Sequence, residues 1–380
     1  MTFKIKFNVP YRDKKCDQNV IKLLNNKNNS LFGFDQFTRK NEKIISQNYK
    51  FKNILFTNSC TSALEISALL TYRKNKNVVL MPSYTFTSTA SSFLRANFKL
   101  KFLDISNRSM MPDLETIKKS ITKKTGVIVV VHYAGLSIED LDKLKKICLK
   151  RQIYLVEDAA QALGSYFKNK PLGSFGDLSC FSFHETKNIH CGSGGMLVVN
   201  NKQFLNKSHY ILERGTDRRL VLQNIKKKYS WVTIGSSFNS TELNSSFLTY
   251  QLLNYKKILI KRRKIYERYI NLFNKNNLNE KFYFNKNFKY LFNYHCLYII
   301  LKEKNSTNFI NFLGKNKIQA FIGYVPLHTS PYGKTLGKQK LINTDLLSNK
   351  IVRLPIHNYM SLRDVSYVVK IIIKFFSNKF

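Results

Sequence analysis

Two residues in the middle of the chain, Asp158 and Lys187, have types and surroundings suited to covalent chemistry. Asp158 stands where a buried strand should end, two residues after the apolar run at residues 153–156. Lys187 lies between a second apolar stretch, residues 180–183, and a glycine-rich turn at residues 192–195. A lysine held away from water is a candidate nucleophile for Schiff-base chemistry, because desolvation disfavours its charged form. The alternative is a solvated surface residue, as most lysines of this lysine-rich chain are expected to be.

The positions of these two residues relative to the expected strands indicate a ligand site. Ligands of open α/β sheets bind in the crevice outside the carboxyl ends of the strands, so an acid at a strand end is a candidate ligand contact. An acid opposite a pyridine nitrogen and a lysine on an aldehyde are the minimum requirement for pyridoxal 5′-phosphate, whose ring must stay protonated to accept electrons. Asp158 and Lys187 therefore predict this cofactor.

Segments nearer the N-terminus alternate between strand and helix patterns, as in a parallel α/β sheet. Residues 54–56 predict a strand and residues 58–61 a turn, and a helix is expected to begin near Thr61 with Ser62 in its first turn. A helix N-terminus binds phosphate readily, although an ordinary helix cap explains the same residues. Residues 78–105 give a strand, a helix and a further strand, which again favours a parallel sheet.

The C-terminal third predicts a different arrangement. A long basic helix is expected from about Gln251, followed by strands around residues 295–302 and 320–328. The KRRK run of the helix could form a nucleic-acid patch, but Ile, Leu and Tyr at helical spacing favour a solvated helix face instead.

Several motifs carry a resemblance to a known family. They are MPSYTFTSTA (81–90), VHYAG (131–135), VEDAAQALGS (156–165), GSFGDLSCFSFHETKN (173–188) and GSGG (192–195). Together they resemble the sugar aminotransferases of the DegT/DnrJ/EryC1/StrS family, and the agreement extends from FKIKFNVP near the start to YVPLH and RLPI near the end. The resemblance implies the type I fold of pyridoxal phosphate enzymes, of class α/β. Residues 1–250 would form an N-terminal arm and a large domain with a mostly parallel sheet flanked by helices, and residues 251–380 a smaller α+β domain.

The resemblance also implies roles for individual residues. Asp158 would pair with the protonated ring nitrogen, and Lys187 would form the Schiff base and then act as general acid and base. The other cofactor contacts implied are Gln161 near the phenolic oxygen, Phe86 stacked on the ring, and, for the phosphate, Thr61, Ser62, Ser182 and Ser237. By composition alone Phe86 could instead be a core residue. His328 would lie near the substrate, and no metal is expected.

Three positions depart from the family pattern. His190 and Ser193 stand where the family commonly has Thr and Glu, and Ser237 replaces an asparagine that contacts the phosphate in many members. A serine has fewer donors and less reach than an amide. The segment that carries Ser237 crosses to the neighbouring subunit in homologues, so a homodimer with shared active sites is expected. His132, at the end of another predicted strand, is expected to be structural.

The reaction that the resemblance implies is transfer of an amino group from glutamate to C4 of dTDP-4-dehydro-6-deoxy-D-glucose. The product would be dTDP-4-amino-4,6-dideoxy-D-galactose, used for a surface polysaccharide such as enterobacterial common antigen. One alternative is another nucleotide-sugar aminotransferase of the same family, with a different nucleotide or product stereochemistry. A second is a catalytically degenerate subunit that keeps the fold only for binding.

The amino-acid composition indicates which binding partners and which cellular compartment to expect. Lysine and arginine total 63 against 23 acids, which gives a net charge of +40. Such a balance suggests nucleic acid, but the lysines are dispersed with Asn and Ile rather than gathered in a patch, so no nucleic-acid partner is expected. The six cysteines form no CxxC or Cys/His cluster, which favours a reducing compartment. Without a secretory leader or an apolar run of roughly 20 residues, a soluble cytoplasmic protein is expected.

Overall fold

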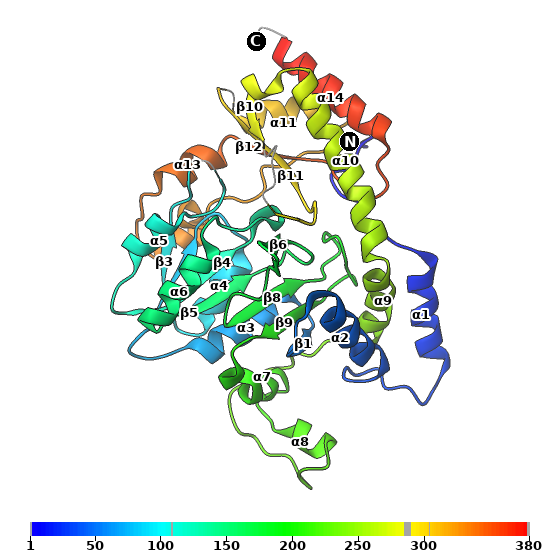
Figure 1. The fold of residues 1–380 in the computed structure, drawn as a ribbon, viewed down its shortest axis with the longest axis vertical. Coiled ribbons are helices and arrows are strands. Elements are labelled where there is room, and N and C mark those ends of the chain that lie inside the picture. The colour runs from blue at the N-terminus through cyan, green and yellow to red at the C-terminus, as the bar shows by residue number, and fades with distance from the viewer. Residues whose placement is uncertain (1, 108, 285–289, 304, 378–380) are drawn as a thin grey trace.

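A seven-stranded sheet forms the centre of the molecule (Figure 1). The computed structural model describes residues 2–107, 109–284, 290–303 and 305–377. In spatial order the strands are β1 (Ile54–Thr57), β9 (Gly195–Val199), β8 (Leu178–Ser182), β5 (Tyr154–Asp158), β4 (Thr125–Val131), β2 (Val78–Pro82) and β3 (Lys99–Leu103). β9 pairs antiparallel with β1 and β8, and all other neighbours in the sheet are parallel.

Apolar side chains cover both faces of this sheet. Along β4, Val127 and Val129 belong to one cluster of buried residues, whereas Ile128 and Val130 belong to another. The first cluster includes residues of α3 (Cys60–Thr71), α4 (Thr87–Arg95) and α7 (Leu205–Leu212), and the second includes residues of α2 (Gln36–Tyr49), α6 (Leu141–Arg151) and α9 (Glu242–Leu253). Because a parallel strand in the middle of such a sheet is buried on both sides, β4 is apolar from Val127 to Val131. The expected large α/β part is confirmed.

A second, smaller sheet lies towards the C-terminus and consists of three antiparallel strands. The strands are β10 (Phe282–Phe284), β11 (Leu297–Leu301) and β12 (Ile351–Leu354), and they share an apolar cluster with α10 (Tyr255–Lys275), α11 (Ser306–Lys315) and α14 (Leu362–Ser377). Ile5 belongs to the same cluster and forms a bridge with Ile318, so the N-terminal arm packs on this part of the chain (Figure 1). All strands of the large sheet precede residue 250 in the sequence, and all strands of the small sheet follow it. A domain boundary at that residue remains a prediction.

The other elements are short or lie at the periphery. They are α1 (Lys14–Asn25), α5 (Leu114–Ser120), the hairpin of β6 (Tyr166–Phe167) and β7 (Lys170–Pro171), α8 (Arg218–Leu222), α12 (Pro331–Thr335) and α13 (Ile342–Ser348). Within the described residues, no helix combines the length and the apolar character that crossing a membrane requires.

The C-terminal part differs from the sequence expectation in two places. The helix expected from Gln251 is two helices, because α9 ends at Leu253 and α10 begins at Tyr255. Asn254 lies between them with a φ of −90° and a ψ of 4°. Residues 320–328 were expected to be a strand, but only Phe321 forms a bridge, to Arg353. Gly323 turns the chain there with a φ of +90°, a conformation that favours glycine.

Candidate active site

A cavity of about 360 Å³ lies where the strands β4, β5 and β8 end. Asp158 is the last residue of β5 and Ser182 the last residue of β8, and both line this cavity. Lys187 lines it as well, from the segment that follows β8. The structure therefore brings together the acid and the lysine that the sequence singled out, although 28 residues of chain, including a hairpin, lie between them.

Asp158 is a buried carboxylate held by two donors. Thr89 Oγ1 donates a hydrogen bond of 2.7 Å to Oδ2, and the backbone N–H of Ala160 donates one of 3.2 Å to Oδ1. Burial raises the pKa of Asp158, while the Thr89 hydrogen bond and the charge of Lys187 oppose that rise. A buried acid at a strand end, with a cavity in front of it, suits a protonated ring nitrogen as its partner.

A neighbouring acid, Glu157, has a structural role. It is fully buried and accepts hydrogen bonds from three backbone N–H groups of residues 173–176, and His132 Nε2 lies 2.8 Å from its Oε2. Burial alone would raise the pKa of Glu157, but the His132 and backbone hydrogen bonds outweigh it and hold that pKa below its ordinary value. This pair agrees with the structural role expected for His132, which also lines the cavity.

The first turns of two helices form a hydroxyl-rich wall of the cavity. Ser59 caps α3, where its Oγ accepts a hydrogen bond of 3.1 Å from the backbone N–H of Ser62. Thr61 Oγ1 donates a hydrogen bond of 2.9 Å to Oγ of Ser88, in the first turn of α4. Because a helix N-terminus with hydroxyls beside it attracts a phosphate, these groups and Ser182 fit the phosphate of the predicted cofactor.

The hydroxyls that line the cavity are not all those that the sequence predicted. The Ser62 hydroxyl donates to Asn58 and does not line the cavity, whereas Ser59 and Ser88 do. Neither Ser59 nor Ser88 was singled out from the sequence. A serine directly before a predicted helix is an N-cap signal that could have found Ser59, but Ser88 reaches the wall only because α4 packs beside α3.

Gln161 and Phe86 both line the cavity. Gln161 Oε1 accepts a hydrogen bond of 2.7 Å from the Ala134 N–H, and its Nε2 donates one of 2.8 Å to the Tyr324 hydroxyl. These two bonds orient the amide towards the site. Phe86 is 57% exposed, with its ring centroid 6.1 Å from that of Tyr324, so it is not the core residue that composition allowed. Its apolar face is available to a flat ligand.

Two of the three residues that depart from the family pattern hold the loop after Lys187. His190 is buried, its Nε2 lies 2.7 Å from the carbonyl oxygen of Tyr11, and burial lowers its pKa. Ser193 lines the cavity and donates a hydrogen bond of 3.1 Å to the carbonyl oxygen of Asn58, while its own carbonyl accepts one of 2.7 Å from Asn244. The substituted loop is therefore anchored at both positions.

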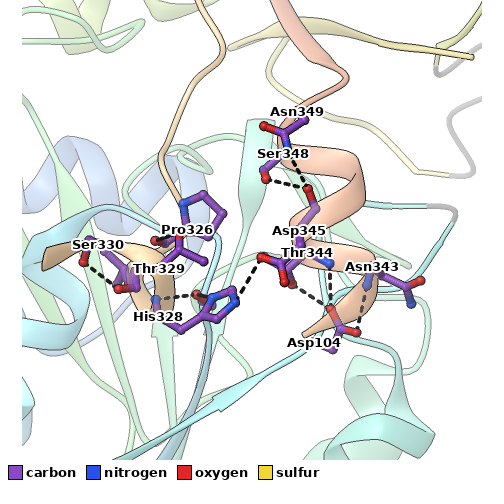
Figure 2. A network of polar contacts seen from close by, with 12 residues as sticks. Asp104, Pro326, His328, Thr329, Ser330, Asn343, Thr344, Asp345, Ser348 and Asn349 are labelled. Atoms are coloured by element: carbon purple, nitrogen blue, oxygen red, sulfur yellow. Dashed lines mark hydrogen bonds and ion pairs between the residues drawn. The ribbon is translucent and has the colours of Figure 1, made fainter. Parts of the chain in front are cut away.

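The remaining two predicted residues lie outside the cavity lining. Ser237 is exposed and accepts a hydrogen bond of 3.1 Å from Arg214. His328 is buried in the polar network of Figure 2, with its Nδ1 2.7 Å from Ser83 Oγ and its Nε2 3.1 Å from Asp345. That network links the turn after β2 to α13, so His328 has a structural setting in this subunit.

Besides Ser59 and Ser88, the cavity lining includes further polar residues that were not assigned a role from the sequence, among them Tyr324, His295 and Arg353. Tyr324 opens the YVPLH run and Arg353 opens the RLPI run, but neither was given a role, because membership of a motif does not show which side chain points into a cavity. His295 had no signal beyond its residue type. Among the described residues, no group of three or more His, Cys, Asp or Glu side chains could hold a metal ion.

The cavity combines a buried acid, a lysine and hydroxyls at a helix N-terminus, at the edge of a mostly parallel sheet, which is what a pyridoxal phosphate enzyme of the type I fold requires. The chain belongs to the DegT/DnrJ/EryC1/StrS aminotransferase family, whose model matches residues 10–373. The cofactor of this family is pyridoxal 5′-phosphate, so the predicted cofactor is confirmed.

Individual relatives agree along most of the chain. The UDP-4-amino-4,6-dideoxy-N-acetyl-beta-L-altrosamine transaminase of Campylobacter jejuni strain 81-176 is 31% identical over 341 residues, 86% of each chain. The GDP-perosamine synthase of Escherichia coli O157:H7 is 26% identical over 321 residues, 84% of each chain. The structure of Helicobacter pylori PseC, an aminotransferase involved in the biosynthesis of pseudoaminic acid, superposes with a TM-score of 0.90 at 25% identity, over 99% of this chain and 100% of that one.

Proposed function

We propose that this aminotransferase moves the amino group of glutamate to the C4 keto carbon of a 4-keto-6-deoxy sugar linked to a nucleoside diphosphate. Glutamate would leave as 2-oxoglutarate, and the sugar would leave as the 4-amino-4,6-dideoxy product, so that one amino group and one keto oxygen change places. The observation that carries the proposal is the pairing of Lys187 and Asp158 on one cavity in a member of this family.

Four residues of the cavity would have distinct roles in this reaction. Pyridoxal 5′-phosphate supplies an electron sink and an aldehyde carbon that carries the amino group between the two substrates. Asp158 would hold the proton on the ring nitrogen, and Lys187 would move the proton to and from the substrate carbon. Gln161 would orient the phenolic oxygen, and Phe86 would cover the ring and exclude water.

The most specific part of the proposal is the identity of the nucleotide that carries the sugar. The Campylobacter relative is named for a UDP-linked 4-amino-4,6-dideoxy sugar and the Escherichia relative for a GDP-linked sugar. These names support a nucleoside diphosphate sugar with its amino group at C4. They favour UDP or GDP over the dTDP that the motifs suggested, and dTDP-4-dehydro-6-deoxy-D-glucose remains a third substrate to assay.

We also propose that the working enzyme is a homodimer with shared active sites. Ser237 lies outside its own cavity, at the end of a segment with large exposed apolar side chains. Trp231 is 79% exposed and Ile234 is 72% exposed. Apolar groups of this size on one segment, which runs beside the residues between α7 and α8 at the lower end of Figure 1, are typical of a protein interface. A second copy would cover them and bring Ser237 near the partner's phosphate site.

The proposal is tested by the absorbance spectrum of the purified protein with pyridoxal 5′-phosphate, before and after glutamate. The wild type should show a visible band that glutamate removes, and the 4-keto sugars linked to UDP, GDP and dTDP should restore it to different extents. Lys187→Ala should not form that band. Lys207→Ala, which removes an exposed lysine of α7, should behave as the wild type.

Two outcomes would contradict the proposal. If Lys187→Ala and the wild type gave the same spectrum, Lys187 would not be the lysine that binds the cofactor. If the wild type formed the band but glutamate and other amines left it unchanged, the chain would be a cofactor-binding subunit without turnover.

A further inference from the structure

Arg353 is a cation at the edge of the active-site cavity, and no acid of the described part of the chain forms an ion pair with it. It lies on β12 of the smaller sheet, and its side chain lines the cavity. Nε donates a hydrogen bond of 2.9 Å to the Tyr133 hydroxyl. The guanidinium carbon lies 5.0 Å from the centroid of the Tyr133 ring and 4.6 Å from that of Tyr324. Aromatic faces therefore surround the charge without neutralising it.

One terminal nitrogen of this guanidinium is buried and makes no hydrogen bond to the described residues. Arg353 Nη2 has no hydrogen-bond partner among the described residues, and Arg353 takes part in none of the ion pairs found there. A buried charged donor without a partner is costly, so such groups are normally paired. An unpaired one beside a cavity indicates a missing anion.

Arg262 shows how the same chain satisfies a structural arginine. It is 4% exposed, and its guanidinium donates to the backbone carbonyl oxygens of Tyr294, His295 and Ile356. Arg262 does not line the cavity. Arg353 differs from Arg262 in this respect, because one terminal nitrogen of its guanidinium has no hydrogen-bond partner among the described residues.

The backbone next to Arg353 leaves room for the guanidinium. Gly323 has a φ of +90°, and a Cβ added there would lie 2.8 Å from Arg353 Nε and 2.5 Å from the Tyr84 hydroxyl. Any side chain at position 323 would displace one of these groups. The turn that replaced the expected strand thus allows Arg353 to reach the cavity.

We propose that Arg353 binds a carboxylate of the amino donor, and the same carboxylate of the oxo acid that leaves. This inference rests on the proposed function. A guanidinium matches the planar geometry of a carboxylate and can bind it through two parallel hydrogen bonds. The same anchor serves both directions of the donor half-reaction, because glutamate and 2-oxoglutarate differ only at the carbon that exchanges its amino group.

The surroundings of Arg353 favour a small anion over the diphosphate of the sugar nucleotide. Tyr84, Tyr133 and Tyr324 pack around one another with ring centroids 5.4 to 6.2 Å apart, and they leave one buried nitrogen of Arg353 free. The hydroxyls suited to a phosphate are on α3 and α4, and none of them contacts Arg353. A carboxylate on a short chain fits such an enclosed position better than a diphosphate with a nucleoside attached.

The test uses the holoenzyme and the variants Arg353→Gln and Arg353→Lys, with Arg363→Gln as the matched control. Arg363 is an exposed residue of α14, so its substitution removes the same charge from the same part of the chain. The KM for glutamate should rise about 10- to 100-fold in Arg353→Gln, the range expected for losing a hydrogen bond between charged groups. Arg353→Lys should recover part of this loss.

A binding measurement separates the anchor from catalysis. In calorimetric titrations, 2-oxoglutarate should bind the pyridoxal form of the wild type and of Arg363→Gln, and Arg353→Gln should bind it about 10- to 100-fold more weakly. The KM for the sugar nucleotide should stay within about twofold in all variants. Gly323→Ala disturbs the guanidinium without removing it, so this variant should also bind 2-oxoglutarate more weakly than the wild type. Thermal melts should show that each variant is folded.

Three results would overturn the proposal: equal 2-oxoglutarate affinity of Arg353→Gln and wild type, no binding to either, or a loss confined to the sugar nucleotide. The last would assign the diphosphate to Arg353. If the wild type took an amino group from no donor, the proposed function would fail. The 2-oxoglutarate titration would still decide the anchor, because it requires no turnover.

Discussion

Thr89 Oγ1 donates a hydrogen bond of 2.7 Å to Oδ2 of Asp158, which joins the first turn of α4 to the last residue of β5. Thr85 Oγ1 lies 3.0 Å from Thr89 Oγ1 and supports its orientation. The carboxylate is therefore fixed by a helix whose first turn also carries Ser88 of the hydroxyl wall. One short helix positions groups at both ends of the proposed cofactor site.

Removing this hydrogen bond should weaken the binding of the cofactor. Thr89→Val keeps the side-chain shape but leaves Oδ2 of Asp158 without its donor, and the pKa of Asp158 should rise further because that bond opposes the effect of burial. Spectroscopic titration with pyridoxal 5′-phosphate should give a dissociation constant about tenfold higher, or about 1.4 kcal/mol. Thr87→Val, at an exposed position of the same helix, should leave it unchanged. Equal affinities for all three proteins would contradict the role of Thr89.

Glu157 should make stability depend on pH in acid. Its pKa in the folded protein lies below the ordinary value, so its contribution is present above a pH of about 4.3 and is lost as the pH falls through the folded value. Glu157→Gln should lower the free energy of unfolding at pH 7 by about 3 to 5 kcal/mol, because it breaks a buried pair with His132.

Urea unfolding at several pH values measures this effect. The difference between wild type and Glu157→Gln should shrink as the pH falls below about 4.3. Glu139→Gln, at an exposed position, should follow the wild type throughout. A difference that does not change with pH would mean that the carboxylate acts only through packing.

Two glycines with similar backbones should respond differently to alanine. Gly173 has a φ of +98°, and a Cβ there would lie 2.3 Å from the Phe181 ring, whereas Gly192 has a φ of +80° with no atom within 4 Å of the added Cβ. Both substitutions carry the backbone cost of about 1 to 2 kcal/mol, and Gly173→Ala adds overpacking of about 1 to 3 kcal/mol. Chemical denaturation should therefore give a lower free energy of unfolding for Gly173→Ala than for Gly192→Ala. Equal losses would show that Phe181 moves aside freely.

The segment around Trp231 should control assembly. Trp231→Glu together with Ile234→Glu places charge on the exposed apolar patch and should shift the protein towards the mass of one 44.4 kDa chain in sedimentation experiments. Cofactor affinity should fall with the dimer fraction, since the Ser237 segment would no longer reach the partner. Leu149→Glu, on an exposed site of α6, is the control. A wild type that sediments as a monomer would refute the shared site.

Much of the site could be predicted from the sequence because its parts are local. Asp158 ends an apolar strand and Lys187 follows the next long one, and parallel strands bring their carboxyl ends to the same edge of a sheet. The helix that begins after residue 58 was also readable, since its capping residues and apolar face are close together in the sequence. The family motifs then connected these local features to a cofactor.

Tertiary structure alone decided the rest. Arg353 meets Tyr133 across 220 residues of sequence, and its value to the site comes from a missing partner, which no local pattern records. His328 matched a family position, yet packing turned it towards Ser83 and Asp345. The sequence by itself predicted most strands of the large sheet and, through the family motifs, the cofactor, because these depend on local hydrophobic pattern and on residues close together in the chain. The roles of Asp158 and Lys187 stay predictions. Which further side chains reach the cavity depended on how the smaller sheet packs against the larger one, and that is a sum of contacts between distant segments.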